Sequence, residues 1–424
     1  MSKLNSTADE TKPAETPKIL LIQDYLFRRH DYRLNTVANE IERTPKGKND
    51  WESTTEEQLT YELFVHGFKG FQAHLAALLK SDQIPKSDPL KAYFEGLAPW
   101  VEGDPDYIDQ LAAHVKALDP NWFRVMFKKH LVRMVACAVE AIQFNKQCLT
   151  LVSTQNDGKT SFLRYLCPPT LSRYYTEQVD FSNKDGQISL TSNFIINIDE
   201  LKGLQRQEVN QLKAFFSTAT VKVRRPYDKR DSWARRKASF VASNNRKDFL
   251  TDETGNVRWL VFEIAGINHD FGGPNGYSSV PIDRVWAQAY ALLKAGFPPE
   301  MTPDEIAMSE AINRTKFFSN SMEIELLQKY CEPAEANAPG AEFMTATDLH
   351  IYLTQQVPTA VKINANNLGK ALAFLNYTQK DKKVNGGARK GYWVKKLEIV
   401  ETTLRPYDQD IKPLKEKQLE VVGF

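Results

Sequence analysis

The stretch STQNDGKTSF, residues 153–162, decides how the rest of this sequence is interpreted. A phosphate-binding loop has the pattern G-x-x-x-x-G-K-[ST] and lies between a strand and a helix. Gly158, Lys159 and Thr160 match the end of that pattern; the apolar run CLTLVS precedes it and TSFLRYL continues as a helix. Ser153 stands where the first glycine belongs. That glycine shapes the turn and makes no charge contact, so we expect a weakened geometry at most. The alternative is a polar turn that merely ends in Gly-Lys-Thr.

Each residue of the loop has an expected role in binding ATP and Mg²⁺. Gly158 lets the backbone approach the phosphates, whose charge is met by consecutive N–H groups. Lys159 would reach the β and γ phosphates, and Thr160 would ligate Mg²⁺. The other loop residues expected to contact the nucleotide are Ser153, Gln155, Asn156, Asp157 and Ser161.

An acidic pair follows an apolar strand further along the chain. The segment NFIINIDEL predicts a strand over residues 193–198 that ends at Asp199 and Glu200. We expect this strand beside the strand of the phosphate loop, with both carboxylates at the edge where open α/β sheets bind ligands. Asp199 would hold Mg²⁺ through water, and Glu200 would orient and deprotonate the attacking water. The alternative is an acidic turn at the end of a strand.

Two further segments supply candidate polar groups. KASFVASNN ends in Asn244 and Asn245, either of which can hold the attacking water against the γ phosphate. FLTDETGNVRWLVFEI carries Arg258 after a Gly-Asn turn, and an arginine there can stabilise a phosphate across a subunit boundary. An ordinary surface ion pair is the alternative for Arg258.

The order of elements predicts an α/β fold with a mainly parallel sheet. Residues 1–17 should be a disordered tail, residues 18–118 a mostly helical domain, and residues 119–300 the ATPase domain. The ATPase domain opens with a helix from Asp119-Pro120 to about Gln143. Strands are expected at 147–153, 193–198, 219–225, 237–243 and 257–264, and helices from Lys159 and over 205–217. In residues 301–424, two short helices (344–357 and 363–375) precede two strands around Gly386-Gly387. This order is typical of a winged helix-turn-helix.

Basic residues are concentrated in two places although the net charge is only +2. Residues 222–237 hold eight basic and two acidic side chains, and residues 379–396 hold seven basic and one acidic. Aromatic residues among these cations favour contact with nucleic acid, although solvated surface loops are the alternative. In the second cluster we expect Lys382, Lys383, Arg389 and Lys390 to form a basic wing on duplex DNA.

Other classes of protein find little support in the sequence. It contains no apolar run of membrane-spanning length and no signal peptide, and its four cysteines lack CxxC spacing, so we expect a cytoplasmic protein. The seven histidines form no metal-ligand spacing, and we expect no metal or catalytic role for them.

The motifs in this order resemble the virulence-associated E family of AAA+ ATPases, which are related to superfamily 3 helicases and are carried on phages and other mobile elements. The resemblance covers roughly residues 20–270 and rests on the phosphate loop, INIDEL, VRRPYDKRD with RRKASFVASNN, and FLTDETGNVRW. It implies a hexameric, ATP-driven DNA motor. Lys159 and Thr160 fall on its first nucleotide motif, Asp199 and Glu200 on its second, Asn245 on the sensor asparagine and Arg258 on the arginine finger.

The resemblance also implies a hairpin between Lys222 and Lys237 that grips single-stranded DNA in the central pore. Our candidates there are Arg225, Tyr227, Lys229 and Arg230. The predicted function is therefore an ATP-dependent DNA helicase or translocase that forms a homo-oligomeric ring and acts in replication of a phage or mobile element. A second hypothesis is a DNA-binding ATPase that acts as a nucleotide-dependent assembly switch, in origin binding or phage interference, without unwinding. A transcription regulator is a third, but it leaves the Asp199-Glu200 strand unexplained.

Overall fold

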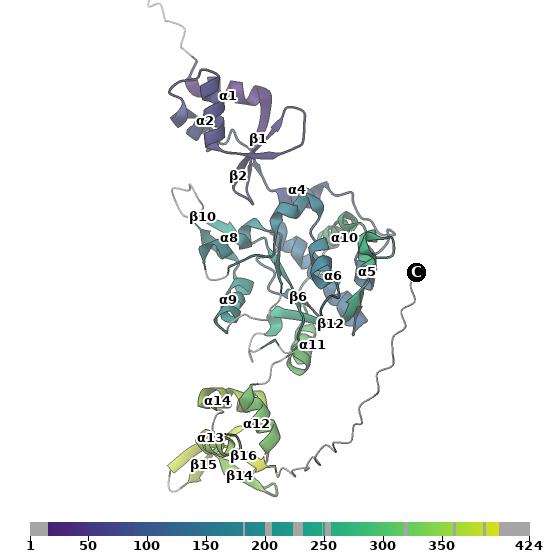
Figure 1. Ribbon diagram of the computed structural model, residues 1–424, viewed down its shortest axis with the longest axis vertical. Helices are drawn as coiled ribbons and strands as arrows, with labels where there is room; N and C mark the ends of the chain where they lie inside the picture. The colour runs from purple at the N-terminus through teal and green to yellow at the C-terminus, as the bar shows by residue number, and fades with distance from the viewer. Residues whose placement is uncertain are drawn as a thin grey trace, which may run out of the picture. The chain divides into compact units, whose positions relative to one another are not determined.

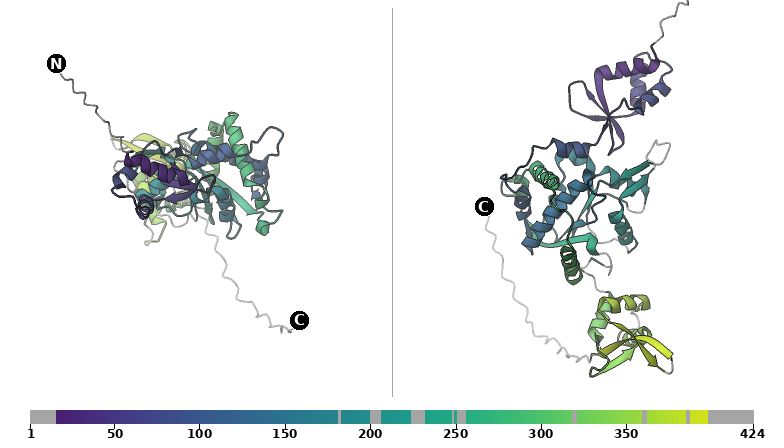
Figure 2. Two further views of the ribbon diagram at one scale, coloured as in Figure 1. Left: turned by 90° about the horizontal axis from the view of Figure 1, so that it is seen from above. Right: turned by 180° about the vertical axis from the view of Figure 1, so that it is seen from behind.

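The structure, a computed structural model, describes residues 16–180, 183–199, 206–223, 232–247, 249–250, 256–317, 321–358, 362–384 and 387–397. The chain divides into two compact units, Met1–Ser319 and Asn320–Phe424, each of which is described by itself (Figures 1 and 2). Among the described residues no helix is long and apolar enough to cross a membrane.

The first elements of the larger unit form a small sheet packed against helices. Its strands are β1 (His30–Asn35), β2 (Glu40–Pro45), β3 (Glu52–Thr54) and β4 (Lys86–Ser87), and its helices are α1 (Lys18–Arg29), α2 (Glu56–Val65) and α3 (Gln72–Leu79). The strand order is β3-β2-β1-β4, with β1 antiparallel to β2 and parallel to β4. Residues 18–118 were predicted to be mostly helical, and this sheet was not predicted. Its strands are only partly buried, and charged pairs such as Arg33–Glu42 (2.7 Å) interrupt the apolar alternation that signals a strand.

A six-stranded sheet lies at the centre of the larger unit. Its strands are β5 (Val115–Ala117), β6 (Cys148–Val152), β7 (Tyr175–Thr176), β8 (Ile195–Ile198), β11 (Ser239–Asn244) and β12 (Trp259–Ile267). The order is β5-β12-β6-β11-β8-β7, and every neighbouring pair is parallel except β5 with β12. The predicted α/β fold with a mainly parallel sheet is therefore confirmed. One detail was wrong: β8, which ends just before Asp199, does not lie beside β6, because β11 lies between them.

Helices cover both faces of this sheet. They are α4 (Pro89–Gly96), α5 (Tyr107–Ala113), α6 (Pro120–Ala138), α7 (Lys159–Tyr165), α8 (Lys184–Ser192), α9 (Arg206–Ser217), α10 (Ile282–Lys294) and α11 (Pro303–Ile312). Figure 1 shows α5, α6 and α10 on one side of β6 and β12, and α8 and α9 on the other. Alternate residues of β6 accordingly enter two cores: Leu149 and Leu151 join one, and Cys148 and Val152 join the other. Burial on both faces explains why the strands are continuous apolar runs.

The boundaries within the chain differ from those expected. Helices α4 and α5 and strand β5 share the central core, so the segment with a core of its own ends near Ile84 and not at 118. Helix α11 belongs to the larger unit, where Glu305 accepts a 2.7 Å bond from buried Lys129. The second unit therefore begins at Asn320 rather than at 301.

Helix α6 is a buried helix that carries polar groups in its interior. Asp119 caps its first turn by accepting a bond from the Trp122 backbone N–H at 3.1 Å. It ends at Ala138, earlier than expected, because Glu140 takes a left-handed conformation (φ 63°) that breaks the helix. His130 is fully buried, and neither ring nitrogen has a hydrogen-bond partner within the described part of the chain. Burial, with the nearby charge of Arg133, lowers the pKa of His130 well below its ordinary value.

A buried arginine joins the start of β11, an inner strand of the sheet, to the end of α9. Strands β9 (Thr220–Val223) and β10 (Ser232–Arg235) form an antiparallel pair of their own, and Arg236 follows directly. Its guanidinium donates to the carbonyl oxygens of Ala238 (2.7 Å), Asn145 (2.8 Å), and Phe215 and Phe216 (both 3.0 Å). Phe215 and Phe216 lie in the last turn of α9, so Arg236 satisfies carbonyls that the helix leaves open. The β9–β10 pair is thereby fixed to the end of α9 and to the start of β11.

The smaller unit contains a short helical group and a four-stranded antiparallel sheet. Its elements are α12 (Met322–Tyr330), β13 (Cys331–Pro333), β14 (Ala341–Met344), α13 (Ala346–Gln355), α14 (Ala365–Phe374), β15 (Gln379–Val384) and β16 (Gly387–Lys396). The two predicted helices and the two predicted strands, here β15 and β16, therefore occur in the predicted order. Leu349 and Leu353 on α13 and Leu368 on α14 are fully buried. β16 pairs with β13, β14 and β15.

Candidate functional site

The loop between β6 and α7 contains two residues with left-handed backbone and lines a cavity. β6 is buried along its whole length and places the loop at its carboxyl end. Gly158 takes a left-handed conformation with φ 77°, which residues with a side chain rarely adopt, and Asn156 has φ 70°. Ser153 is not among the described residues with positive φ, so this position does not need a glycine for its backbone. Residues 155–161 all line one cavity of about 540 Å³.

Lys159 lies folded back over the loop. Its ammonium donates to Ser153 Oγ at 2.8 Å, to the Thr154 carbonyl at 2.7 Å and to the Ser153 carbonyl at 3.3 Å. The residue is 6% exposed, and burial lowers the pKa of its ammonium, partly opposed by the charges of Asp157 and Asp199. Ser153 does not itself line the cavity, so its observed role is to accept a bond from this lysine.

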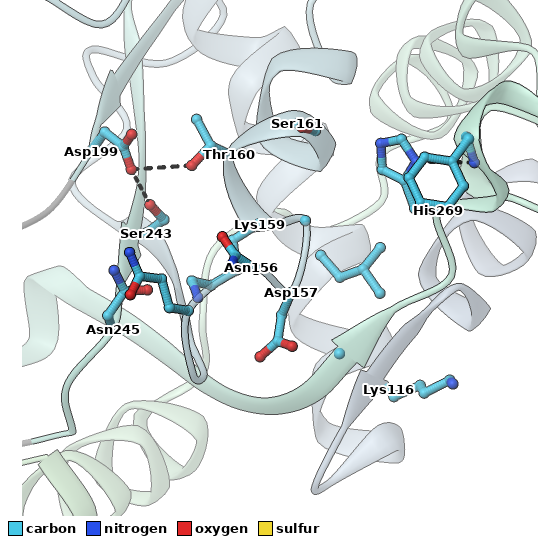
Figure 3. A pocket seen from close by; sticks show the side chains of 15 residues that line it. Lys116, Asn156, Asp157, Lys159, Thr160, Ser161, Asp199, Ser243, Asn245 and His269 are labelled. Atoms are coloured by element: carbon cyan, nitrogen blue, oxygen red, sulfur yellow. Dashed lines mark hydrogen bonds between the residues drawn. The ribbon is translucent and has the colours of Figure 1, made fainter. Parts of the chain in front are cut away.

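A cluster of oxygens lies next to Lys159, contributed by three separate segments (Figure 3). Thr160 Oγ1 donates to Asp199 Oδ1 at 3.1 Å, and Ser243 Oγ donates to the same carboxylate oxygen. Asp199 follows β8 and Ser243 lies near the end of β11, so the carboxyl ends of neighbouring parallel strands bring these groups to one edge of the sheet. The intervening strand β11 does not separate Asp199 from the loop, and it adds Ser243, which we did not predict.

The two candidate asparagines have different surroundings. Asn244 is buried; its side-chain amide donates to the Arg246 carbonyl at 2.9 Å, and its oxygen accepts from the Asn245 backbone N–H at 3.0 Å. Asn245 is exposed and lines the cavity near Lys159 (Figure 3). Only Asn245 of the two thus has a side chain placed to meet a ligand in this cavity.

The opposite end of the cavity is formed by residues that sequence reasoning missed. They are Lys116, Gly266, Ile267, His269 and Phe271. Lys116 lies on β5. Gly266 and Ile267 are the last residues of β12, and His269 and Phe271 come soon after it. β12 pairs with β6 on the side away from β11. The available signal was that a polar, glycine-rich segment, GINHDFGG, follows an apolar strand. The sequence does not show the strand order, so it could not show that this segment lies beside the loop between β6 and α7.

Comparison with protein families bears on this arrangement. The model of the virulence-associated protein E-like domain matches residues 98–317, just over half of the chain and the whole of the cavity lining. The chain belongs to the virulence-associated protein E-like family. This agrees with the resemblance that the order of motifs had indicated. Comparison with curated protein sequences gives no match.

Solved structures share the fold of this virulence-associated protein E-like chain. The apo C-terminal region of NrS-1 matches with a TM-score of 0.52 at 12% identity, over 90% of this chain and 100% of that one. A second form of the same region has a TM-score of 0.50, at 12% identity, over 89% and 99% of the two chains. Cch of SCCmec type IV, described as an active helicase, aligns over 87% of this chain and 92% of that one at 11% identity, but with a TM-score of only 0.34. At these identities the NrS-1 likeness shows a common fold, and the Cch alignment carries no argument.

Several predicted residues of this family member lie elsewhere or outside the described residues. Arg258 lies on the short 3₁₀ helix η2 (Asn256–Arg258), does not line the cavity, and donates from Nε to Ser217 Oγ at 3.1 Å. Glu200 lies outside the described residues. So do Arg225, Tyr227, Lys229 and Arg230, which come between β9 and β10 in the sequence.

The four predicted basic residues of the β15–β16 hairpin are exposed but do not share one face. Lys382 lies opposite Arg389 across the two strands, whereas Lys383 lies opposite Ala388 and Lys390 opposite Asp381. Side chains alternate between the faces of a strand, so the four residues divide into a first basic pair (Lys382 and Arg389) and a second basic pair (Lys383 and Lys390). In the first pair, Lys382 Nζ also lies 4.5 Å from the centre of the Trp393 ring.

Proposed function

We propose that this chain is an ATP-hydrolysing DNA motor, a helicase or translocase of the superfamily 3-like AAA+ type that serves replication of a phage or mobile element. Membership of the virulence-associated protein E-like family supports the class. The observation that carries the proposal is the contact between Thr160 of the phosphate loop and Asp199 of a separate strand, 3.1 Å apart beside Lys159. A cavity of about 540 Å³ also falls within the range of about 300–1,000 Å³ that small-molecule ligands occupy.

The residues at the oxygen cluster fit a magnesium ion. Mg²⁺ prefers hard oxygen ligands, commonly one or two protein groups together with substrate phosphates and waters. Thr160 and Asp199 supply a hydroxyl and a carboxylate at one point, and these two residues would hold the ion. When bound, Mg²⁺ neutralises charge on the phosphates. Lys159 would exchange bonds to its own loop for bonds to phosphate oxygens, and Asn245 would orient the attacking water.

Two steps of the proposed mechanism use residues that are not seen in the cavity. Glu200 lies outside the described residues, and Arg258 does not line the cavity. We propose Glu200, which follows Asp199 directly, as the base that takes a proton from the attacking water. Arg258 does not line the cavity of its own chain, which supports a role at the nucleotide of a neighbouring subunit in a ring, probed below through assembly. Hydrolysis would then require oligomers, with a hexamer as the proposed state.

The proposed DNA contacts lie in two places. The segment between β9 and β10, with Arg225, Tyr227, Lys229 and Arg230, would contact single-stranded DNA. The helices α13 and α14 with the β15–β16 hairpin would form a winged helix that contacts duplex DNA. Arg236 follows β10 and donates to the Ala238 carbonyl just before β11, the strand whose Ser243 contacts Asp199, which supports a mechanical link between the first of these segments and the proposed nucleotide site.

ATP turnover with and without single-stranded DNA, on protein whose assembly state is monitored, tests the proposal. We expect turnover that is stimulated by DNA, rises with assembly and is abolished by Lys159→Ala. Arg258→Ala should leave ATP binding intact and abolish turnover, and mixing it with Lys159→Ala subunits should restore some activity if the arginine acts in a neighbour. Turnover that persists in the Lys159→Ala variant would contradict the proposed site.

A nucleotide-dependent assembly switch is the second candidate function. The observation that favours it is that Lys159 is held by three bonds to its own loop, which a bound nucleotide would have to replace. Nucleotide binding would therefore change the loop from one arrangement to another, as a switch requires. A strand-displacement assay on forked DNA separates the two. The switch would bind the fork with ATP and leave its strands paired, whereas the motor would separate them.

A further inference from the structure

The cavity of the phosphate loop has two chemically different ends. One end contains Thr160, Asp199 and Asn245, which are polar or charged. The other contains Ile267, His269 and Phe271, which offer an aliphatic side chain and two rings. Figure 3 shows Asp199 and His269 on opposite sides of Lys159. A nucleoside triphosphate has the same polarity, with phosphates at one end and a flat, stackable base at the other.

The aromatic end lies directly against the loop. A Cβ atom added to Gly158 would meet His269 Cδ2 at 3.6 Å and Ile267 Cβ at 4.0 Å. The imidazole therefore lies beside the glycine at which the backbone would approach a phosphate. A nucleotide whose phosphates follow the loop has His269 and Ile267 within reach of its other end.

The segment that carries these rings is held in place before any ligand arrives. The Phe271 backbone N–H donates to His269 Nδ1 at 3.1 Å, and the His269 ring meets the Tyr277 ring edge to face at 5.2 Å. Asp270 accepts from the backbone N–H of Asn275 at 2.8 Å, which closes the turn. Gly276 packs so closely on the His269 carbonyl that a side chain would not fit there. The orientation of His269 is thus set by its own loop.

Phe271 has features that packing within the chain does not explain. Its side chain is 97% exposed, although large aromatic side chains usually gain their stability from burial. Its backbone is left-handed, with φ 42° and ψ 37°, a conformation that costs free energy for a residue with a Cβ. Its nearest described ring is that of His269, at 5.3 Å between centres. Strained backbone and an uncovered ring at the mouth of a ligand cavity are features of a group that a ligand covers.

We propose that Phe271, with His269 and Ile267, forms the subsite that receives the base of the nucleotide. The ring of Phe271 stacks on the base, Ile267 contacts it, and His269 supports Phe271 from the loop side. Stacking uses the face that every base has, so the subsite takes the nucleobase as a class and does not by itself select adenine. The inference rests on the proposed function, because it assumes that phosphates occupy the loop.

The test compares ATP with inorganic tripolyphosphate, which has the phosphates and no base. Binding of each to the full chain is measured by calorimetry. Phe271→Ala should raise the Kd for ATP by about 5- to 150-fold and leave the Kd for tripolyphosphate unchanged. Phe271→Trp keeps a ring and should stay within about twofold of the parent chain. Phe64→Ala, which removes another exposed phenylalanine (67%) outside the cavity lining, should change neither Kd.

The outcomes separate this inference from the proposed function. Lys159→Ala should weaken both ligands, and if it weakened neither, the phosphate site itself would be wrong. If Lys159→Ala weakened both but Phe271→Ala left ATP binding intact, the base subsite would be refuted and the phosphate site would stand. If Phe271→Ala weakened ATP and tripolyphosphate equally, the ring would act on the loop and not on a base, which also overturns the subsite.

Discussion

Replacing Ser153 with alanine should strengthen ATP binding, although Ser153 occupies a position of the phosphate loop. In the structure the ammonium of Lys159 donates to Ser153 Oγ at 2.8 Å and to two carbonyl oxygens of the loop. An ammonium has three N–H donors, so it must release at least one of these bonds to reach a phosphate. Of the three acceptors, only the Ser153 hydroxyl belongs to a side chain, so a substitution can remove it without altering the backbone.

The size of the effect follows from that bond. A hydrogen bond to a charged group contributes about 1.5–3 kcal/mol when it is well shielded, but Ser153 is only half-buried and water can replace it. We therefore expect a gain of about 1 kcal/mol, or about a fivefold lower Kd for ATP, in Ser153→Ala. Ser153→Gly removes the same hydroxyl but adds backbone freedom that costs about 0.4–1 kcal/mol, so its net gain should be small.

Calorimetric titration of ATP into the parent chain and the two variants measures the difference. The essential control is Ser153→Ala in a Lys159→Ala background, where no ammonium remains to be released and the substitution should have no effect. The reasoning is refuted if Ser153→Ala weakens ATP binding in the parent chain. It is equally refuted if the gain persists without the lysine.

Three further predictions concern the rest of the chain. Arg236→Met leaves four carbonyl oxygens without their buried donor and should lower the free energy of unfolding by about 3–5 kcal/mol in a urea titration. Arg235→Met, at the neighbouring exposed arginine, should lower the free energy of unfolding by less than about 0.5 kcal/mol. If the two variants lost equal stability, the role of Arg236 would be contradicted. Because the pKa of His130 is lowered in the fold, the unfolded chain binds a proton below about pH 6.5 that the folded chain does not. Stability should therefore decline as pH falls below that value, by up to about 1.4 kcal/mol per unit, and a urea series at several pH values should show a shallower decline in His130→Leu. If one face of the β15–β16 hairpin binds duplex DNA, replacing the basic pair on that face with alanines should reduce the slope of log K against log salt concentration by about 1.8. Replacing the pair on the other face should leave that slope unchanged. Equal effects of both pairs would show that the hairpin does not bind DNA through one face.

Many residues at the Thr160 end of the cavity could be predicted because their signals are local. Gly158, Lys159 and Thr160 are adjacent in sequence, and their order between an apolar strand and a helix reflects the short-range geometry of one turn. Asp199 was found for a similar reason, since a carboxylate at the end of a buried strand is visible without knowing the partners of that strand. The placement of Asn245 rather than Asn244 at the cavity was not visible, because it depends on which way the end of β11 turns.

The aromatic end could not be predicted, and the reason is the strand order. β12 follows β6 by more than a hundred residues, and nothing local to GINHDFGG shows that β12 pairs with β6. The same limit produced the error in placing β8 directly beside β6. Pairing between strands is set by the packing of helices on both faces, which is a property of the whole sheet.

The sequence by itself determined the class of fold, the loop of residues 153–161 between a strand and a helix, and the chemical types of the groups near it, because these depend on periodicity and on residues that are neighbours in the chain. Only the tertiary structure decided that Thr160 meets Asp199 across an intervening strand, that Ser153 accepts a bond from Lys159, and that Phe271 lies exposed at the far end of the same cavity. Those contacts join segments that are distant in sequence or depend on side-chain direction. Their free energy is therefore set by how the sheet is assembled and not by any one stretch of residues.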